Sequence, residues 1–408
     1  MLFIFGPAVR LINRWRFAVR FAVIGAAGGL LVAGLLAQFL IGVGSKLEAT
    51  RNEIQGAAMI VPIRQTTETM HDLVTGLTLA SAGASDPTVA RSAQEATRRV
   101  DDLLKAAQAS ADPRWKLEGS WGRLLKKWDA AKATLPSSSS PEIRQMTEVL
   151  EGELASHARN IADATTLTLD GEVATYYLTD VLITHLPQLT AVLSQTRLKA
   201  AYIAEVQMID AGDKGRLDKL VSDALIQYAR LRENLERVSA QSEKNPVIEA
   251  ALDKLGGDIT ALQAFINDQL IFKTEVEVRP ADVLARTGAP MLSSAVLGET
   301  LEKELVGALV QREARLVNER NLNLLLAAMG LLVAGYLSMG SYLSLEYAAQ
   351  RLIQGGRTLA DGDLRHVLGH RRHAGRGHWH RHTAQSHPSS PWRRQSGLFQ
   401  PARLGAAT

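Results

Sequence analysis

The sequence predicts an all-α protein: an elongated helical-bundle domain between two membrane-spanning helices, followed by a disordered C-terminal tail. Residues 21–44 and 322–345 are two apolar stretches of 24 residues, and neither contains a charge. A bilayer core of ~30 Å needs about 20 helical residues, so each stretch is long enough to span it. Between them, apolar residues recur with a period near 3.6, which is typical of helices, and long alternating runs are scarce.

The basic excess of the chain lies at its two ends. Residues 1–20 carry four arginines and residues 366–408 carry seven, with no acidic residue in either segment. The 35 basic residues between them face 42 acidic ones, so the main body is net acidic and gives no support for nucleic-acid binding. The chain has no cysteine, which excludes disulfides, thiolate metal sites and cysteine nucleophiles.

The first apolar stretch, 21–44, is too long for a secretory signal and lacks a small-residue cleavage site. It is therefore predicted to be an uncleaved anchor. The arginines before it predict a cytoplasmic N-terminus, which places residues 45–320 outside, in the periplasm of a bacterium. Gly25 and Gly29 form a small-xxx-small pair that permits close helix approach, although ordinary glycine usage explains them equally well.

The segment 45–320 contains well-marked helix breaks, among them Asp112-Pro113, Asp170-Gly171 and Asn245-Pro246. A leucine stripe on the last helix, from Leu297 to Leu316, predicts a bundle or dimer seam. Residues 274–279 alternate and form the one candidate strand. The expected helices cover 47–82, 87–110, 116–134, 141–168, 172–210, 214–242 and 246–272.

The second apolar stretch leads into an amphipathic helix that is expected to stop at Gly362-Asp363-Leu364. A membrane helix that runs into a short amphipathic helix with this ending resembles the start of a HAMP linker, which joins outside sensing to inside signalling in bacterial receptors. The resemblance gives Gly362, Asp363 and Leu364 the role of a signal relay. A plain membrane anchor with a polar tail is the alternative.

Residues 170–180 read D-G-E-V-A-T-Y-Y-L-T-D and are followed by Leu186-Pro187. This segment resembles a Y-Y-L-x-D…L-P stretch in a family of bacterial membrane receptors, most often methyl-accepting chemotaxis proteins and also sensor histidine kinases and diguanylate cyclases. The resemblance spans roughly residues 10–365. It implies a helical periplasmic sensor between two spans that feeds a HAMP linker.

Candidate ligand-binding residues fall on two predicted helices. Tyr176 and Tyr177 lie four and three residues before Asp180 and can share its helix face, where a phenol beside a carboxylate suits a polar or cationic ligand. The same groups also suit a structural hydrogen bond inside a bundle, with Pro187 setting a kink. On the first helix, Arg64 and Thr67 can line a ligand face, or they form part of a solvated surface.

No nucleotide-binding, metal-binding or nucleophile motif precedes residue 366, so neither an enzyme activity nor a cofactor is expected. The tail, 366–408, holds seven of the ten histidines. Metal binding, binding to anionic lipid and out-of-frame translation compete as explanations. We favour the last, because a frame shifted by one nucleotide over 370–387 permits an acidic turn followed by L-N-R-I, as expected in the second half of a HAMP linker.

The sequence thus predicts a homodimeric inner-membrane receptor for an unknown small molecule or periplasmic protein, most like a chemotaxis receptor and truncated before its output domain. A truncated kinase or cyclase receptor, or a scaffold with a metal-binding tail, are the alternatives. The expected segments are the basic cytoplasmic N-terminus (1–20), first span (21–44), periplasmic sensor (45–320), second span (321–345), linker start (346–365) and tail (366–408).

Overall fold

A computed structural model describes residues 17–83, 87–240 and 245–360, and every regular element within these ranges is helical. The elements are α2 (Phe17–Ser81), α3 (Pro87–Ser110), η1 (Pro113–Trp115), α4 (Glu118–Thr134), η2 (Leu135–Ser137), α5 (Ser140–Ala164), η3 (Leu167–Leu169), α6 (Val173–Asp180), η4 (Val181–His185), α7 (Leu186–Val206), α8 (Ala211–Ser239), α9 (Pro246–Ile266), η5 (Asn267–Ile271) and α10 (Pro280–Ala360). The prediction of an all-α protein is confirmed for this part of the chain.

Polar side chains at the predicted breaks start the helices. The Glu142 carboxylate accepts hydrogen bonds from the Ser139 amide at 2.7 Å and from its hydroxyl at 2.8 Å, which anchors the start of α5. Asp210 accepts from the Asp213 amide at 2.7 Å before α8. Asn245 accepts from the Val247 amide at 3.0 Å before α9. Each acceptor satisfies an amide that the first turn leaves without a helical partner.

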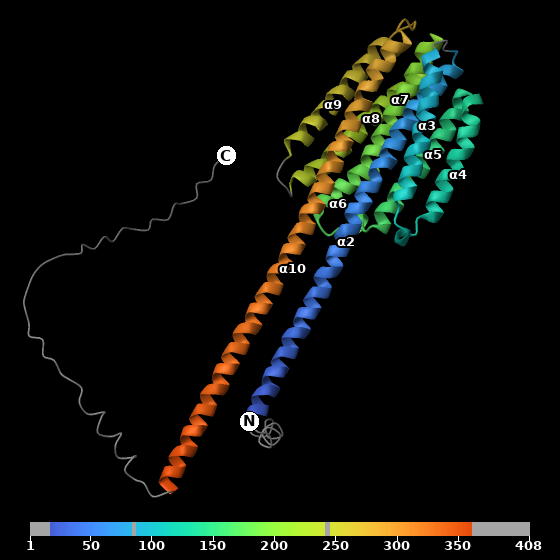
Figure 1. Ribbon diagram of the computed structural model, residues 1–408. Helices are drawn as coiled ribbons and strands as arrows, with labels where there is room; N and C mark the ends of the chain where they lie inside the picture. The colour runs from blue at the N-terminus through green and yellow to red at the C-terminus, as the bar shows by residue number, and fades with distance from the viewer. Residues whose placement is uncertain (1–16, 84–86, 241–244, 361–408) are drawn as a thin grey trace, which may run out of the picture. The chain divides into compact units, whose positions relative to one another are not determined.

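Within residues 24–332 the helices lie side by side, with α8 and α9 on one flank, α3, α4 and α5 on the other, and α2, α7 and α10 between them (Figure 1). Their buried side chains form two clusters. The first core gathers around α6 to α10 and includes Leu189 and Leu301. The second core gathers around α3, α4 and α5 and includes Leu124 and Ile161. Helix α2 contributes to both, so it joins the two halves of the domain.

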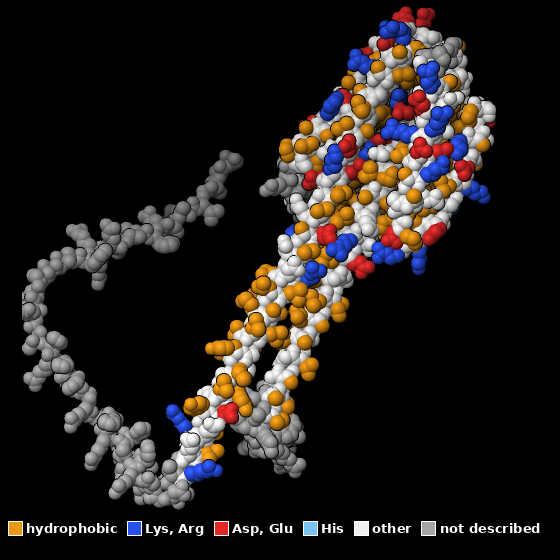
Figure 2. Space-filling view, viewed as in Figure 1, with side chains coloured by type: hydrophobic (Ala, Val, Ile, Leu, Met, Phe, Trp, Pro, Cys, Tyr) orange, Lys and Arg blue, Asp and Glu red, His pale blue; other side chains and the backbone are white. Residues whose placement is uncertain are grey.

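Helices α2 and α10 are far longer than the others, at 65 and 81 residues. Each contains a stretch that is long and apolar enough to cross a membrane, within Gly25–Ser81 and Pro280–Gln354 respectively. Hydrophobic side chains coat these stretches and are almost all exposed, while charged side chains crowd over the helical domain (Figure 2). An exposed apolar surface of this extent is unfavourable in water and suits a lipid environment.

Most predicted breaks coincide with helix ends, but the candidate strand at 274–279 is wrong. This segment is an irregular connection between η5 and α10, and no strand lies among the described residues. It alternates because Val276 turns into the first core and Val278 packs against it. The leucine stripe is a bundle seam of the chain itself, since its first four members are at most 1% exposed: Leu297, Leu301, Leu305 and Leu309.

Helix α10 continues without a break through residues 346–360, as the amphipathic pattern predicts. The relay residues Gly362, Asp363 and Leu364 lie outside the described residues, as does the whole tail. The kink expected at Pro187 stays a prediction. A π-helical turn, η4, ends two residues before this proline, and it accommodates the proline because the backbone hydrogen bonds shift to i→i+5 there.

The buried histidine of the second core, His157, is 1% exposed. Its ring packs against that of Trp121, tilted by 58° with 4.1 Å between the centroids, and its Nδ1 lies 3.0 Å from the Ser120 hydroxyl. Burial, with a smaller contribution from the charge of Arg123, lowers the pKa of His157 to about 4. The imidazole therefore stays neutral at neutral pH and fills the core as an apolar ring with one hydrogen bond.

We expect acid to destabilise the domain through this residue. The unfolded chain binds a proton at His157 near pH 6.5 and the folded chain only near pH 4, so stability falls as pH drops through that interval, by roughly 3 kcal/mol in total. A His157→Gln variant should lose much of this slope, whereas a control variant, Arg230→Gln at an exposed position on α8, should keep it. Denaturant unfolding of the full chain in detergent at pH 7, 6, 5 and 4 measures how the free energy of unfolding depends on pH. An unchanged slope in His157→Gln would contradict the assignment.

Candidate functional site

A groove between α2, α5 and α7 brings together four of the five residues predicted to bind a ligand. Arg64 and Thr67 line a cavity of about 360 Å³, with α5 and the η4–α7 segment opposite. Tyr176 and Asp180 line an adjoining cavity of about 180 Å³. The two cavities share Arg159, Ile183 and Thr184 as lining residues. The walls are largely aliphatic, with charged groups at the edges, which is the usual character of a small-molecule pocket.

Arg64 lies at the edge of the larger cavity but is already paired. Its guanidinium holds Glu302 of α10 in a two-pronged contact, with Nε to Oε1 at 2.7 Å and Nη2 to Oε2 at 2.9 Å, and it also binds Glu68. Burial alone lowers the pKa of Arg64, but the bond and charge of Glu302 raise it above its usual range. Arg64 therefore fastens α2 to α10 beside the groove.

The close packing of three helices at this point depends on a glycine. A Cβ at Gly298 of α10 would lie 3.0 Å from Leu186 Cδ2 and 3.1 Å from Arg64 Cδ. Any larger residue there would push against the side chains of α2 and α7 together.

The two tyrosines of the motif point to different neighbours. Tyr176 lines the smaller cavity with Asp180, as the four-residue spacing predicts. Tyr177 packs against the first core, and its ring lies 5.5 Å from the Arg237 guanidinium of α8. Asp180 is hydrogen-bonded to His185 Nε2 at 3.1 Å across the π-helical turn. Ligand binding by these residues stays a prediction, and Tyr177 is the one that lies outside the groove.

Sequence reasoning missed a buried ionic cluster centred on Arg312 of α10. Its Nη1 donates to Glu53 of α2 at 2.9 Å, and its Nη2 lies 2.9 Å from Asp170 and donates to the Thr175 hydroxyl at 2.7 Å. Its Nε lies 3.1 Å from Glu172. Residues 170–172 thus hold α2 and α10 together at one point. We call Arg312, Glu53, Asp170 and Glu172 the Arg312 cluster.

The charges of the Arg312 cluster do not balance, since three carboxylates face only two guanidinium groups: Arg312, and the exposed Arg315 that pairs with Glu172 at 3.3 Å. Burial raises the pKa of Glu53, the charge of Asp170 raises it further, and Arg312 opposes both without cancelling them. For Arg312, burial lowers the pKa, but its bonds to Asp170 and Glu172 raise it more. A proton on Glu53 is therefore favoured by folding. The spacing in the sequence gave no signal for this cluster, because Glu53 and Arg312 are 259 residues apart.

The histidines on the described helices are held in structural contacts. His71 Nε2 lies 2.8 Å from Glu151, which also lines the larger cavity, and His185 bridges Asp180 and Asn234. Over residues 17–83, 87–240 and 245–360, no group of three or more histidine and acidic side chains is placed to hold a metal ion.

No protein-family model, curated protein or solved structure shows significant similarity to this chain.

The Arg312 cluster predicts a large loss of stability when its arginine is replaced and little change when Glu53 is replaced. At pH 7.5, Arg312→Gln should lower the free energy of unfolding by about 3–5 kcal/mol, because the buried carboxylates of Glu53 and Asp170 lose their counter-charge. Glu53→Gln should change it by less than about 1 kcal/mol, because glutamine resembles the protonated form that folding favours. The raised pKa of Glu53 means that stability is gained as pH falls towards 4.5, so the loss in Arg312→Gln should shrink at pH 5.

Denaturant unfolding of the full chain, followed by circular dichroism at pH 7.5 and pH 5.0, measures these differences. Arg230→Gln, at an exposed position on α8, is the matched control and should be neutral at both pH values. Equal losses for Arg312→Gln at the two pH values, or a loss for Glu53→Gln as large as that for Arg312→Gln, would refute this account of the cluster.

Proposed function

We propose that the chain is a transmembrane signal-transduction receptor whose elongated helical domain senses a stimulus outside the membrane. The observation that carries the proposal is the continuity of α2 and α10. Each helix begins or ends in an exposed apolar stretch and also contributes buried residues to the packed domain, without a helical break between the two. A shift of either helix in the domain would therefore move its apolar part as well.

Two ionic contacts couple these helices to the groove. Arg64 and Glu302 join α2 to α10 beside the larger cavity, and the Arg312 cluster joins the same two helices to the loop before Tyr176. A ligand that fits one spacing of α2, α5 and α7 better than another would shift the population between two arrangements of α2 against α10. Arg64 and Thr67 on one side, and Tyr176 and Asp180 on the other, are the proposed contacts.

The resemblance of residues 170–187 to bacterial sensors supports a receptor most like a methyl-accepting chemotaxis protein. In this proposal it is a homodimer in the bacterial inner membrane, with both chain ends in the cytoplasm and residues 45–320 in the periplasm. The stimulus is a small molecule or a periplasmic protein. An output of the kinase or cyclase type is the alternative, because the motif is shared by all three classes of receptor.

Because the chain lacks cysteine, the topology can be tested with single introduced thiols. Val247 on α9 and Leu352 on α10 are 61% and 77% exposed and so are accessible to a reagent. In cells with a permeabilised outer membrane, a charged maleimide should label the Val247→Cys variant at once and the Leu352→Cys variant only after the inner membrane is lysed. Immediate labelling of both variants, or labelling of neither before lysis, would overturn the topology.

The signalling part of the proposal predicts a change at Leu352 when the distant Arg312 cluster is broken. A spin label on the Leu352→Cys chain in liposomes should give an intermolecular distance if the chain is a dimer. Adding Arg312→Gln should shift or broaden that distance distribution, whereas adding Arg230→Gln should leave it unchanged. Absence of any dipolar signal would remove the homodimer. A distribution unaffected by Arg312→Gln would leave the chain as an anchored scaffold and not a receptor.

A further inference from the structure

A third cavity, of about 260 Å³, lies where α5 meets α7 and α8, at a distance along α5 from the groove described above. It is lined by residues of four helices: Thr78 of α2, Ser140, Pro141 and Arg144 of α5, Gln195, Leu198, Lys199 and Tyr202 of α7, and Arg216 of α8. Three of these side chains are cationic and none is acidic. The cavity therefore has the lining of an anion site, not that of a gap between packed helices.

The three cations differ in how they are paired: one has a close acidic partner, one a distant partner and one no partner among the described residues. Lys199 is paired with Asp213. The nearest carboxylate to Arg144 is Glu148, at 4.0 Å from Nε, which is too far for a hydrogen bond. Arg216 forms no ion pair or hydrogen bond with any described residue.

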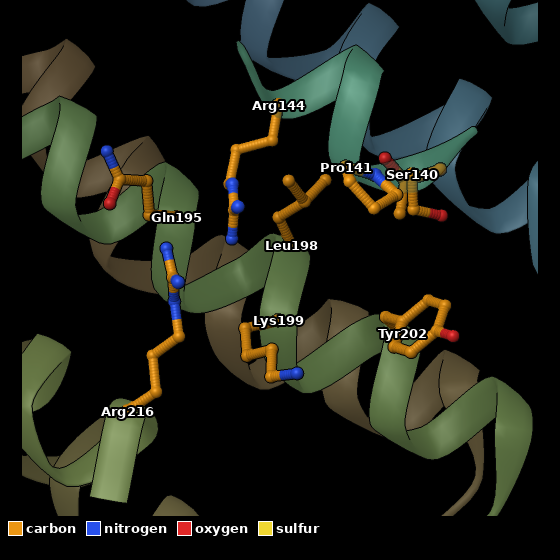
Figure 3. Close-up of a pocket in the computed structure, with 9 residues that line it drawn as sticks. Ser140, Pro141, Arg144, Gln195, Leu198, Lys199, Tyr202 and Arg216 are labelled. Carbon is orange, nitrogen blue, oxygen red and sulfur yellow. The ribbon is translucent and has the colours of Figure 1, made fainter. Parts of the chain in front are cut away.

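The two guanidinium groups point towards each other across the cavity, beside Gln195 (Figure 3). Arg144 comes from a helix of the second core and Arg216 from a helix of the first. Facing like charges repel, and the repulsion is removed if an anion lies between them. A planar guanidinium presents paired donors that match the oxygens of a carboxylate or phosphate group.

A buried hydroxyl gives an independent indication of a ligand. Thr78 is 2% exposed, and its Oγ1 has no hydrogen-bond partner among the described residues. Such a group is costly unless something completes its hydrogen bond. On another wall, Leu198 and Tyr202 supply apolar surface, and the Lys199 ammonium lies 5.6 Å from the Tyr202 ring centroid. The site thus combines two charged anchors, a hydroxyl and a hydrophobic wall.

We propose that this cavity binds a small dianion, whose negatively charged oxygens pair with Arg144 and Arg216 and whose body lies against Leu198 and Tyr202. The bound anion would join α5 to α7 and α8, and hence the second core to the first. This inference goes beyond the proposed receptor function, and it stands on the lining of the cavity alone. Binding is expected whether or not the chain transmits a signal.

The test is isothermal titration of the full chain in nanodiscs at pH 7.5, with succinate and inorganic phosphate as dianionic probes and succinamide as the neutral counterpart of succinate. At least one of the two anions should bind, and succinamide should not. Arg144→Gln and Arg216→Gln should each weaken binding about 10- to 100-fold, as expected for a charged hydrogen-bonding partner. Thr78→Val should weaken it several-fold.

The matched control is Arg230→Gln, which removes the same charge from the exposed face of α8 and should leave affinity unchanged. Circular dichroism establishes that each variant is folded before it is titrated. Failure of both anions to bind the unaltered chain would overturn the proposal, and so would equal binding of succinamide. An equal loss in Arg230→Gln would show a general effect of net charge instead of a site. None of these outcomes depends on the thiol-labelling or spin-label results.

Discussion

The burial of the Arg312 guanidinium against two buried carboxylates and one half-exposed carboxylate is the constraint on which the geometry of this molecule depends. Arg312 can remain buried only while Glu53, Asp170 and Glu172 surround it, and these residues come from α2 and from the loop before α6. Removing any one element would leave charges without partners. The pair of long helices and the short loop are thus held in a single register, and burial together with the charge of Asp170 raises the pKa of Glu53 there.

The division into two cores explains where the groove beside Arg64 and the cavity beside Arg216 lie. Helix α2 gives Ile60 to the first core and Ile63 to the second, so it forms the boundary between them. Side chains pack tightly within each core, but the surfaces between cores carry charged and small residues, and space remains there. The groove beside Arg64 and the cationic cavity beside Arg216 both lie along this boundary. A molecule bound in either would alter how the two halves fit.

Much of the fold could be predicted from the sequence, because proline, glycine and capping residues mark the helix ends and a period of 3.6 marks the helices. The alternation of apolar and polar residues at 274–279 led to the wrong prediction of a strand. An irregular connection that packs two valines against a core has the same sequence pattern as a strand, although it has no partner strand. The site was only partly predictable. Spacing placed Tyr176 with Asp180, but it could not show that Arg64 is paired with Glu302 or that Glu53 meets Arg312, because those contacts depend on tertiary packing.

The π-helical turn at Val181–His185 has a consequence for how this sequence can vary. A π turn contains one residue more than an α turn, so it stores a surplus residue within an otherwise regular helix. Loss of one residue here would convert the turn to α geometry and leave the faces of α6 and α7 nearly as they are. The same loss within α7 would rotate every later side chain by about 100° and expose the first core. Natural length differences among homologous chains should therefore collect at this turn.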